Sequence, residues 1–329
     1  MENSDKLSTY DKLLKKIHAY FLTIWKDKHR DGIQEQWLEN FKHSNVDMEE
    51  RERVNMLYLL SKFMYFGDKE LRHLLLVLYR DLFKYPIISS IRKLNSDTTD
   101  YESLNELFKI ELEKTKFLGV GNPSESGVHM LYYFRQECKL PKKHFISTNE
   151  IITTSVIQQE DKDGIFSTTL KSEIKDTTIK RYIFIDDFCG SGSQAKDILE
   201  NFIGNIKSLD PMIEVNYLML FGTELGIENV RKLNIFNRVE AVFTIDDTFK
   251  AFSDTSRYFN DIMDDPLIEK KFSKGIANKY GKLLSDSPLG YRDGQLLVGF
   301  HHNTPDNSLP ILWCENLNWK PIFKRYNKI

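Results

Sequence analysis

A buried-strand pattern that ends in two acids and a loop of small residues limits the folds open to this chain. Residues 182–185 read Tyr-Ile-Phe-Ile, Asp186 and Asp187 follow directly, and residues 188–194 read Phe-Cys-Gly-Ser-Gly-Ser-Gln. A short apolar run bounded by turn formers is typical of a strand buried on both faces of a parallel sheet. Open α/β sheets bind ligands at the carboxyl ends of such strands, so we expect a ligand site here.

The chemistry of this segment points to a ligand that carries hydroxyls beside a phosphate. Backbone N–H groups of a small-residue loop can approach an anion, and a following helix N-terminus adds favourable partial charge. Buried carboxylates without partners are costly, so adjacent acids usually meet a ligand, a metal or a cation. We therefore predict a ribose 5-phosphate site, although a tight strand-to-helix turn remains an alternative. Its candidate residues are Asp186 and Asp187 for the hydroxyls and Gly190, Ser191, Gly192, Ser193 and Gln194 for the phosphate.

The rest of the chain divides into a helical part and an α/β part. Apolar residues recur three and four apart in residues 8–28 and 48–66, which predicts amphipathic helices, and a further helix is expected to end before Pro86. From about residue 97, short apolar runs alternate with helical patterns, which predicts a parallel sheet with helices on both faces. We expect a helical region at residues 1–96 and an α/β domain at residues 97–329. The expected strands are residues 117–120, 144–147, 182–185, 215–221, 239–245 and 295–300.

Two other segments fit a ligand site. Residues 121–127 read Gly-Asn-Pro-Ser-Glu-Ser-Gly and lie between an expected strand and an expected helix. This loop is either a second anion loop or an ordinary βα turn. Residues 149–176 form a long polar stretch, and loops of more than ~12–15 residues are unusual unless they are functional or disordered. We expect this stretch to be a mobile flap that closes over a bound ligand.

The block from residue 182 to residue 194 resembles the signature of the type I phosphoribosyltransferases. The resemblance implies that the acidic pair holds the 2- and 3-hydroxyls of phosphoribosyl pyrophosphate, that residues 190–194 hold its 5-phosphate, and that Mg²⁺ is bound mainly through the ligand rather than by a direct protein site. The family usually has Thr where this chain has Gln194, and often Gly where it has Ser193. The pyrophosphate loop would comprise Gly121, Asn122, Ser124, Glu125, Ser126 and Gly127, and a hood over the acceptor would include Asn303, Asp306 and Trp313.

A closer resemblance is to PRTase-CE, a bacterial phosphoribosyltransferase-like group encoded in predicted defence or conflict gene clusters. The features that carry it are the helical N-terminal region, the two loops, and residues 303–313. The resemblance implies an effector or accessory protein of anti-phage defence, in which a partner protein or nucleic acid binds the N-terminal helices. If the chain is an enzyme, we expect a glycosyltransferase of the phosphoribosyltransferase class.

Two rival functions remain open at this stage. One is a catalytically inactive regulatory module that binds a nucleotide or RNA. The altered end of the 190–194 loop favours this alternative. The other is an S-adenosylmethionine-dependent amino-methyltransferase, because residues 186–192 differ by one residue from the Asp-Pro-Phe-Cys-Gly-Ser-Gly block of those enzymes. That class also needs a Pro-Pro-aromatic motif, and this chain contains no Pro-Pro.

Composition excludes several other classes. The chain has 46 Lys+Arg against 48 Asp+Glu, so it shows no basic excess of the kind that nucleic-acid binders carry. Its three cysteines lack the spacing of a disulfide framework or a zinc site. No apolar run approaches the ~20 residues that span a bilayer, and the first residues lack the features of a signal peptide. We expect a cytoplasmic protein with no membrane partner.

Overall fold

The acidic pair lies at the end of a central strand in a four-stranded sheet of order β2-β5-β6-β7. The computed structural model describes residues 8–28, 30–122, 125–160, 166–260, 266–316 and 318–326. The strands of the sheet are β2 (Thr115–Gly119), β5 (Arg181–Cys189), β6 (Glu214–Thr223) and β7 (Arg238–Ile245). β5 pairs in parallel with β2 on one side and with β6 on the other. The expected α/β fold with a parallel sheet is confirmed.

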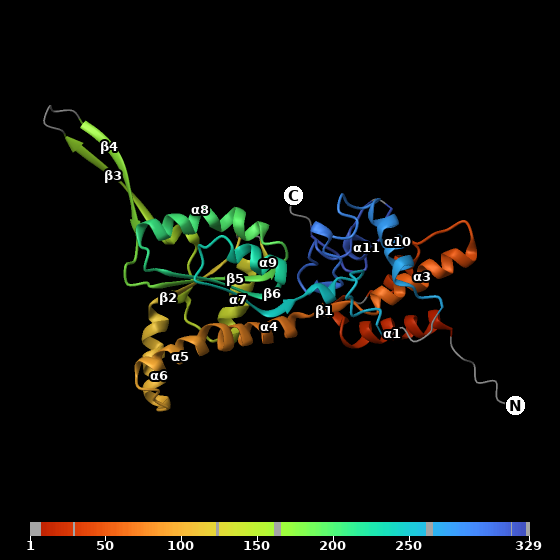
Figure 1. The fold of residues 1–329 in the computed structure, drawn as a ribbon, viewed down its shortest axis with the longest axis horizontal. Coiled ribbons are helices and arrows are strands. Elements are labelled where there is room, and N and C mark those ends of the chain that lie inside the picture. Colours follow the sequence, from red (N-terminus) through yellow and green to blue (C-terminus); the bar gives the residue numbers. More distant parts are fainter. Residues whose placement is uncertain are drawn as a thin grey trace. The chain divides into compact units, whose positions relative to one another are not determined.

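Helices cover both faces of this sheet (Figure 1). On one face, Tyr182 and Phe184 of β5 share a buried core with Leu199 and Ile203 of α8. On the other face, the ring of Phe117 lies 5.2 Å from that of Phe134 in α7 and 5.0 Å from that of Phe83. The helices on the two faces are α5 (Tyr85–Leu94), α6 (Tyr101–Glu113), α7 (Ser126–Glu137), α8 (Ser193–Leu209) and α9 (Glu224–Arg231).

The helix that was expected to end before Pro86 continues through it, so this prediction is wrong. α4 (Asp68–Val77) passes into a π-helix at Leu78–Lys84, and α5 begins at Tyr85. The N–H of Tyr85 donates to the carbonyl of Arg80, five residues back. Pro86 lacks an N–H, and its ring would clash with the carbonyl four residues back in a regular α-helix. The wider π turn supplies that space, as π-bulges do inside α-helices.

Two segments between α7 and β5 differ from the expectations. Residues 144–147 are not a strand: a short 3-10 helix covers Lys142–His144, and only an isolated parallel bridge joins Phe145 to Phe117. The polar stretch at residues 149–176 contains an antiparallel hairpin of β3 (Ile152–Glu160) and β4 (Phe166–Ile174). The centre of the stretch, residues 161–165, lies outside the described residues. The composition fits a hairpin, because β-branched residues favour strands and Thr153, Thr154, Val156 and Thr169 lie in it.

The chain forms two compact units. The described residues of 72–244 make up the unit that contains the sheet, and those of 1–71 and 245–329 make up the other. The second unit contains α1 (Thr9–Thr23), α2 (Ile33–Leu38), α3 (Val46–Leu60), β1 (Met64–Phe66), α10 (Lys270–Gly281), β8 (Val298–Phe300) and α11 (Pro310–Trp313). The chain passes from one unit to the other between residues 71 and 72 and again between residues 244 and 245. The boundary expected between residues 96 and 97 coincides with neither point. It remains a prediction about domains.

The two ends of the chain share one core in this second unit. β1 and β8 pair in parallel, with Met64 opposite Val298. The ring of Phe63 stacks on that of Phe323 at 4.2 Å, and Trp25 meets the same ring edge-on at 5.1 Å. The prediction of a helix over residues 48–66 is therefore wrong at its end, because α3 ends at Leu60 and residues 64–66 form β1. No helix in the described part of the chain has the length and apolar character needed to cross a bilayer.

Candidate functional site

Asp186 points into the core on the α8 face of the sheet. Tyr217 in β6 donates its hydroxyl to Asp186 Oδ2 at 2.7 Å, and the N–H of Asp187 donates to Oδ1 at 2.9 Å. Burial, followed by the neighbouring charge of Asp187, raises the pKa of Asp186 well above its usual range. Burial also raises the pKa of the adjacent Cys189 thiol to about 12, so this thiol stays protonated at neutral pH. Asp186 thus accepts hydrogen bonds from within the protein, and its assignment to the ribose hydroxyls remains a prediction.

Asp187 faces the opposite side of the sheet, because successive side chains of a strand alternate between its faces. Ser126 Oγ donates to Asp187 Oδ1 at 2.7 Å, across 61 residues of sequence. Ser126 is the first residue of α7 and belongs to the loop predicted to be a second anion loop. The structure therefore brings this loop and the acidic pair together at one edge of the sheet.

Glycines allow α7 to begin against the ends of β2 and β5. A Cβ on Gly127 would lie 2.5 Å from the carbonyl oxygen of Val120 and 3.3 Å from Asp186 Oδ1. A Cβ on Gly119 would lie 2.6 Å from the backbone of Val128. Real Cβ atoms do not approach so closely, so these positions require glycine. The Gly-rich composition of this segment is thus explained by a close approach of backbone to the acidic pair.

The loop at residues 190–194 turns sharply into α8. Gly192 has a φ of 77°, in the left-handed region that favours glycine, and it occupies the N-cap position of α8. Ser191 Oγ donates to Ser193 Oγ at 3.0 Å and accepts from the N–H of Ser193 at 3.3 Å. The first N–H groups of any α-helix have no carbonyl acceptor within it and carry partial positive charge. This start of α8 is suited to an anion.

A neighbouring turn holds the loop in place, and sequence reasoning missed it. Thr223 caps α9 by accepting from the N–H of Gly226 at 2.9 Å, and its hydroxyl donates to the carbonyl of Gly190. Asn229 Nδ2 donates to the carbonyl of Ser191 at 3.0 Å. A Cβ on Gly226 would lie only 2.4 Å from the Gly190 oxygen. Thr223 carried a usable signal, since Thr after an apolar strand and before a helical pattern is a typical N-cap.

A hydrogen bond joins the two loops directly. Gln194 Nε2 donates to Glu125 Oε2 at 2.8 Å, across 69 residues of sequence. The N–H of Glu125 donates to the carbonyl of Asn122 at 3.0 Å, and Gly121 adopts a φ of 99°. Of the residues predicted for this loop, Ser124 lies outside the described residues. The remaining members occupy the end of β2 and the start of α7, beside the acidic pair.

The residues predicted for an acceptor hood lie in the other compact unit. Asn303 Oδ1 accepts from the N–H of Tyr326 at 3.1 Å, and Asp306 is paired with Arg325 at 3.3 Å. Trp313 is buried and donates its indole N–H to the carbonyl of Ser308 at 2.8 Å. These contacts stabilise residues 303–326 within their own unit. The hood remains a prediction.

Asp186 and Asp187 are the carboxylates of this site that could contact a metal ion. Among the described residues, no three His, Cys, Asp or Glu side chains are grouped as metal ligands. Asp186 accepts two protein hydrogen bonds, and Asp187 accepts one from Ser126. Mg²⁺ commonly binds through one or two carboxylates plus substrate phosphates and water. A Mg²⁺ ion held mainly through the ligand remains a prediction.

A parallel sheet with an acidic pair and a small-residue loop at the end of its central strand defines a phosphoribosyltransferase-like α/β protein. The chain matches the PRTase-CE family over residues 34–325, and it belongs to that family. This membership favours the phosphoribosyltransferase-like interpretation over the methyltransferase alternative.

Solved phosphoribosyltransferases are also similar to this chain. The Helicobacter pylori xanthine-guanine-hypoxanthine phosphoribosyltransferase has 10% identity and a TM-score of 0.25, covering 56% of this chain and 87% of that chain. The orotate phosphoribosyltransferase from Aeropyrum pernix has 15% identity and a TM-score of 0.23, covering 44% of this chain and 73% of that chain. No curated protein matches this sequence.

Proposed function

We propose that the unit formed by residues 72–244 binds phosphoribosyl pyrophosphate, or a closely related ribose phosphate, together with Mg²⁺. The observation that carries the proposal is the hydrogen bond from Ser126 to Asp187, at 2.7 Å. It places two small-residue loops and an acidic pair at one sheet edge. A ligand with two anionic groups on either side of a diol matches that arrangement.

Each part of the site has a defined task in this proposal. The loop at residues 190–194 and the first turn of α8 receive the 5-phosphate through backbone N–H groups. Asp187 accepts hydrogen bonds from the ribose hydroxyls, and charge-assisted bonds of this kind are the stronger ones. The hydrogen bond between Tyr217 and Asp186 holds the end of β5, and with it Asp187, in place. The loop at residues 121–127 receives the pyrophosphate.

A Mg²⁺ ion bound together with the ligand would offset the negative charge of the pyrophosphate, and Asp186 and Asp187 are the carboxylates of the site that could contact it. The chain's own contribution is to orient the ribose and to hold the two anionic ends apart. The reaction that fits this geometry is displacement at the anomeric carbon: a nucleophile forms a bond to that carbon while its bond to the pyrophosphate oxygen breaks and pyrophosphate leaves. Positioning and charge stabilisation supply the catalysis in such a displacement.

A binding module without turnover is the second candidate. The observation that favours it is the hydrogen bond between Gln194 and Glu125, which links the two anion loops at 2.8 Å. Gln194 stands where the type I family usually has Thr, and it brings a carboxylate next to the phosphate loop. Release of pyrophosphate by purified protein would separate the enzyme from the module, since the module binds ligand but releases none.

The cellular role that we propose is an effector or accessory function in bacterial anti-phage defence. It rests on the resemblance of the chain to proteins encoded in defence gene clusters. The test is to express the chain with its genomic neighbours in a sensitive host and to challenge the cells with a panel of phages. Protection by the wild type and its loss with Asp187→Ala support the role. Full protection by the variant would show that the defence role does not depend on Asp187.

Ligand binding is tested by thermal unfolding of the full chain. Phosphoribosyl pyrophosphate with Mg²⁺ should raise Tm by several degrees, because a ligand at 100 times its Kd stabilises the native state by about 2.7 kcal/mol. Asp187→Asn should abolish this rise. Asp197→Asn, in an exposed position on α8, should retain it. An equal rise in both variants, or a larger rise with S-adenosylmethionine, would refute the proposed site.

A further inference from the structure

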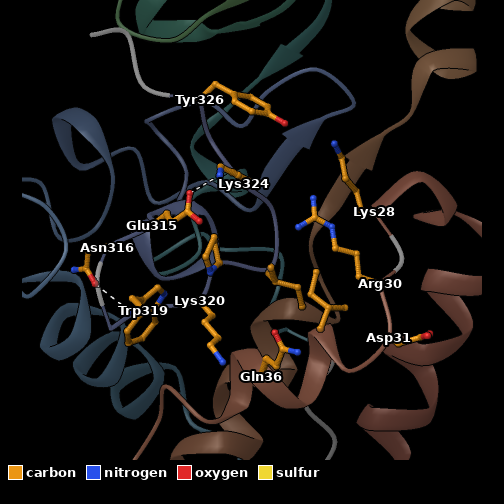
Figure 2. Close-up of a pocket in the computed structure, with 13 residues that line it drawn as sticks. Lys28, Arg30, Asp31, Gln36, Glu315, Asn316, Trp319, Lys320, Lys324 and Tyr326 are labelled. Atoms are coloured by element: carbon orange, nitrogen blue, oxygen red, sulfur yellow. Dashed lines mark hydrogen bonds and ion pairs between the residues drawn. The ribbon is translucent and has the colours of Figure 1, made fainter.

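A cavity of about 440 Å³ lies in the unit that contains residues from both ends of the chain. Residues from 28 to 36 line one wall, and residues from 315 to 326 line the facing wall (Figure 2). Small-molecule sites in proteins typically measure ~300–1,000 Å³. The cavity therefore has the size of a site for a small molecule, and it contains none of the residues assigned to the ribose-phosphate site.

Positive charge exceeds negative charge in this cavity. Glu315 is paired with Lys324 at 2.6 Å, and Lys28 Nζ donates to the carbonyl of His301 at 2.7 Å. Within the part of the chain that the structure describes, the side chains of Arg30 and Lys320 contact no carboxylate. Both residues are exposed.

The orientation of the side chains reinforces this excess. Figure 2 shows the Arg30 side chain directed toward the facing wall and Asp31 directed away from it. Asp31 therefore does not offset the charge of Arg30 inside the cavity. An unpaired guanidinium and an unpaired ammonium on facing walls suit an anion, and Arg is well matched to the geometry of phosphate.

The exposed aromatic ring of Tyr326 lines the same cavity. Tyr326 is 60% exposed, and its backbone N–H is tied to Asn303 Oδ1 at 3.1 Å. The ammonium of Lys324 lies 6.0 Å from the centroid of its ring. Exposed rings beside basic side chains are a recurring platform on which nucleic-acid bases stack. The tethered backbone keeps this platform next to the cations.

We propose that this cavity is a nucleoside-phosphate site, in which Arg30 binds the phosphate, Lys320 adds positive charge from the facing wall, and Tyr326 stacks on the base. The site is separate in its residues from the ribose-phosphate site, so the two stand or fall independently. A free nucleotide and the terminal nucleotide of an RNA strand present the same chemistry. The two sources differ in how many phosphates contact the protein.

Calorimetric titration of the full chain carrying Asp187→Asn tests the proposal with the first site weakened. The probes are AMP, GMP, CMP and UMP, a single-stranded RNA tetranucleotide, and inorganic pyrophosphate. Arg30→Gln combined with Lys320→Gln should weaken binding of every bound probe at least tenfold, as expected when a charged hydrogen bond and a second positive charge in the cavity are lost. Lys274→Gln, an exposed lysine on α10 outside the cavity, should leave binding unchanged.

Tyr326→Ala separates the contribution of base stacking to binding from that of the phosphate. It should weaken the nucleotides or the RNA about tenfold, because stacking on an aromatic ring contributes ~1–3 kcal/mol per base, and it should spare pyrophosphate. Tighter binding of the tetranucleotide than of any mononucleotide identifies RNA as the source, and the reverse identifies a free nucleotide. Absence of binding to all probes, or binding that the Arg30 and Lys320 substitutions leave unchanged, would overturn the proposal.

Discussion

At the scale of single residues, Asp186 makes stability depend on pH. Its raised pKa means that the native protein keeps this proton in a pH range where the unfolded chain has lost it. The range begins near ~3.9, the pKa of an unfolded aspartate, and ends at the raised native value. Within it the native state binds more protons than the unfolded state, so the free energy of unfolding falls as pH rises.

Asp186→Asn should therefore raise Tm at pH 8, by about 2–4 °C for each kcal/mol recovered. The gain should shrink as the pH approaches 4, because the carboxyl of the unfolded chain then also becomes protonated and the two states bind the same number of protons. Thermal unfolding between pH 4 and pH 8 measures the difference. The matched variant Asp197→Asn changes an exposed carboxyl on α8 and serves as the control. A gain that is constant with pH would show that Asp186 is ionised in the native protein.

Glu125 is the second residue with a testable charge effect. Its carboxylate accepts from Gln194 between the two loops that would bind anions. Glu125→Gln keeps an oxygen acceptor for Gln194 and removes the negative charge. We expect phosphoribosyl pyrophosphate with Mg²⁺ to bind about tenfold more tightly, which corresponds to ~1.4 kcal/mol. Calorimetry against Glu228→Gln, an exposed position on α9, checks this. Weaker binding would instead assign Glu125 to the metal.

At the scale of elements, the close packing of α9 on the phosphate loop sets the loop's position. Gly226→Ala places a Cβ 2.4 Å from the Gly190 oxygen, so the loop or α9 must move. We expect a loss of ~1–3 kcal/mol of stability, as for other overpacked sites, together with loss of ligand binding. Gly204→Ala in α8 is the control. Its Cβ meets nothing within 4 Å, so it should stabilise the protein by up to ~1 kcal/mol.

Denaturant unfolding and calorimetry measure both glycine variants. Normal ligand affinity in Gly226→Ala would mean that the loop binds its ligand independently of α9. A destabilised Gly204→Ala would point to a general intolerance of alanine in this unit rather than to the contact with Gly190.

The elements also show what the sequence could and could not predict. β5 and the loop after it were predictable, because an apolar run and a Gly-Ser turn are local signals. The pairing of β1 with β8 was not, since it joins Met64 to Val298 through a contact between distant parts of the chain. Ser126 was predicted to lie in an anion loop, but its bond to Asp187 depends on the parallel order of β2 and β5.

At the scale of the whole molecule, the core shared by the two chain ends predicts which fragments fold. A fragment of residues 68–244 retains the sheet, its helices and the acidic pair, so it should unfold cooperatively and bind phosphoribosyl pyrophosphate. A fragment of residues 97–329 loses Trp25, Trp37 and Phe41 from the buried core of the other unit. We expect it to aggregate. Circular dichroism and gel filtration of both fragments decide between them, and a stable monomeric 97–329 would support the boundary expected from sequence.

The most informative measurement on the whole chain is a crystal structure with phosphoribosyl pyrophosphate and Mg²⁺. The 5-phosphate should lie on the backbone of residues 190–194, with a ribose hydroxyl within hydrogen-bonding distance of Asp187. The pyrophosphate should lie on the loop that ends in Ser126 and Gly127. A ligand bound elsewhere, or a phosphate loop left empty at saturating ligand, would show that the acidic pair and its two loops are not a ribose-phosphate site.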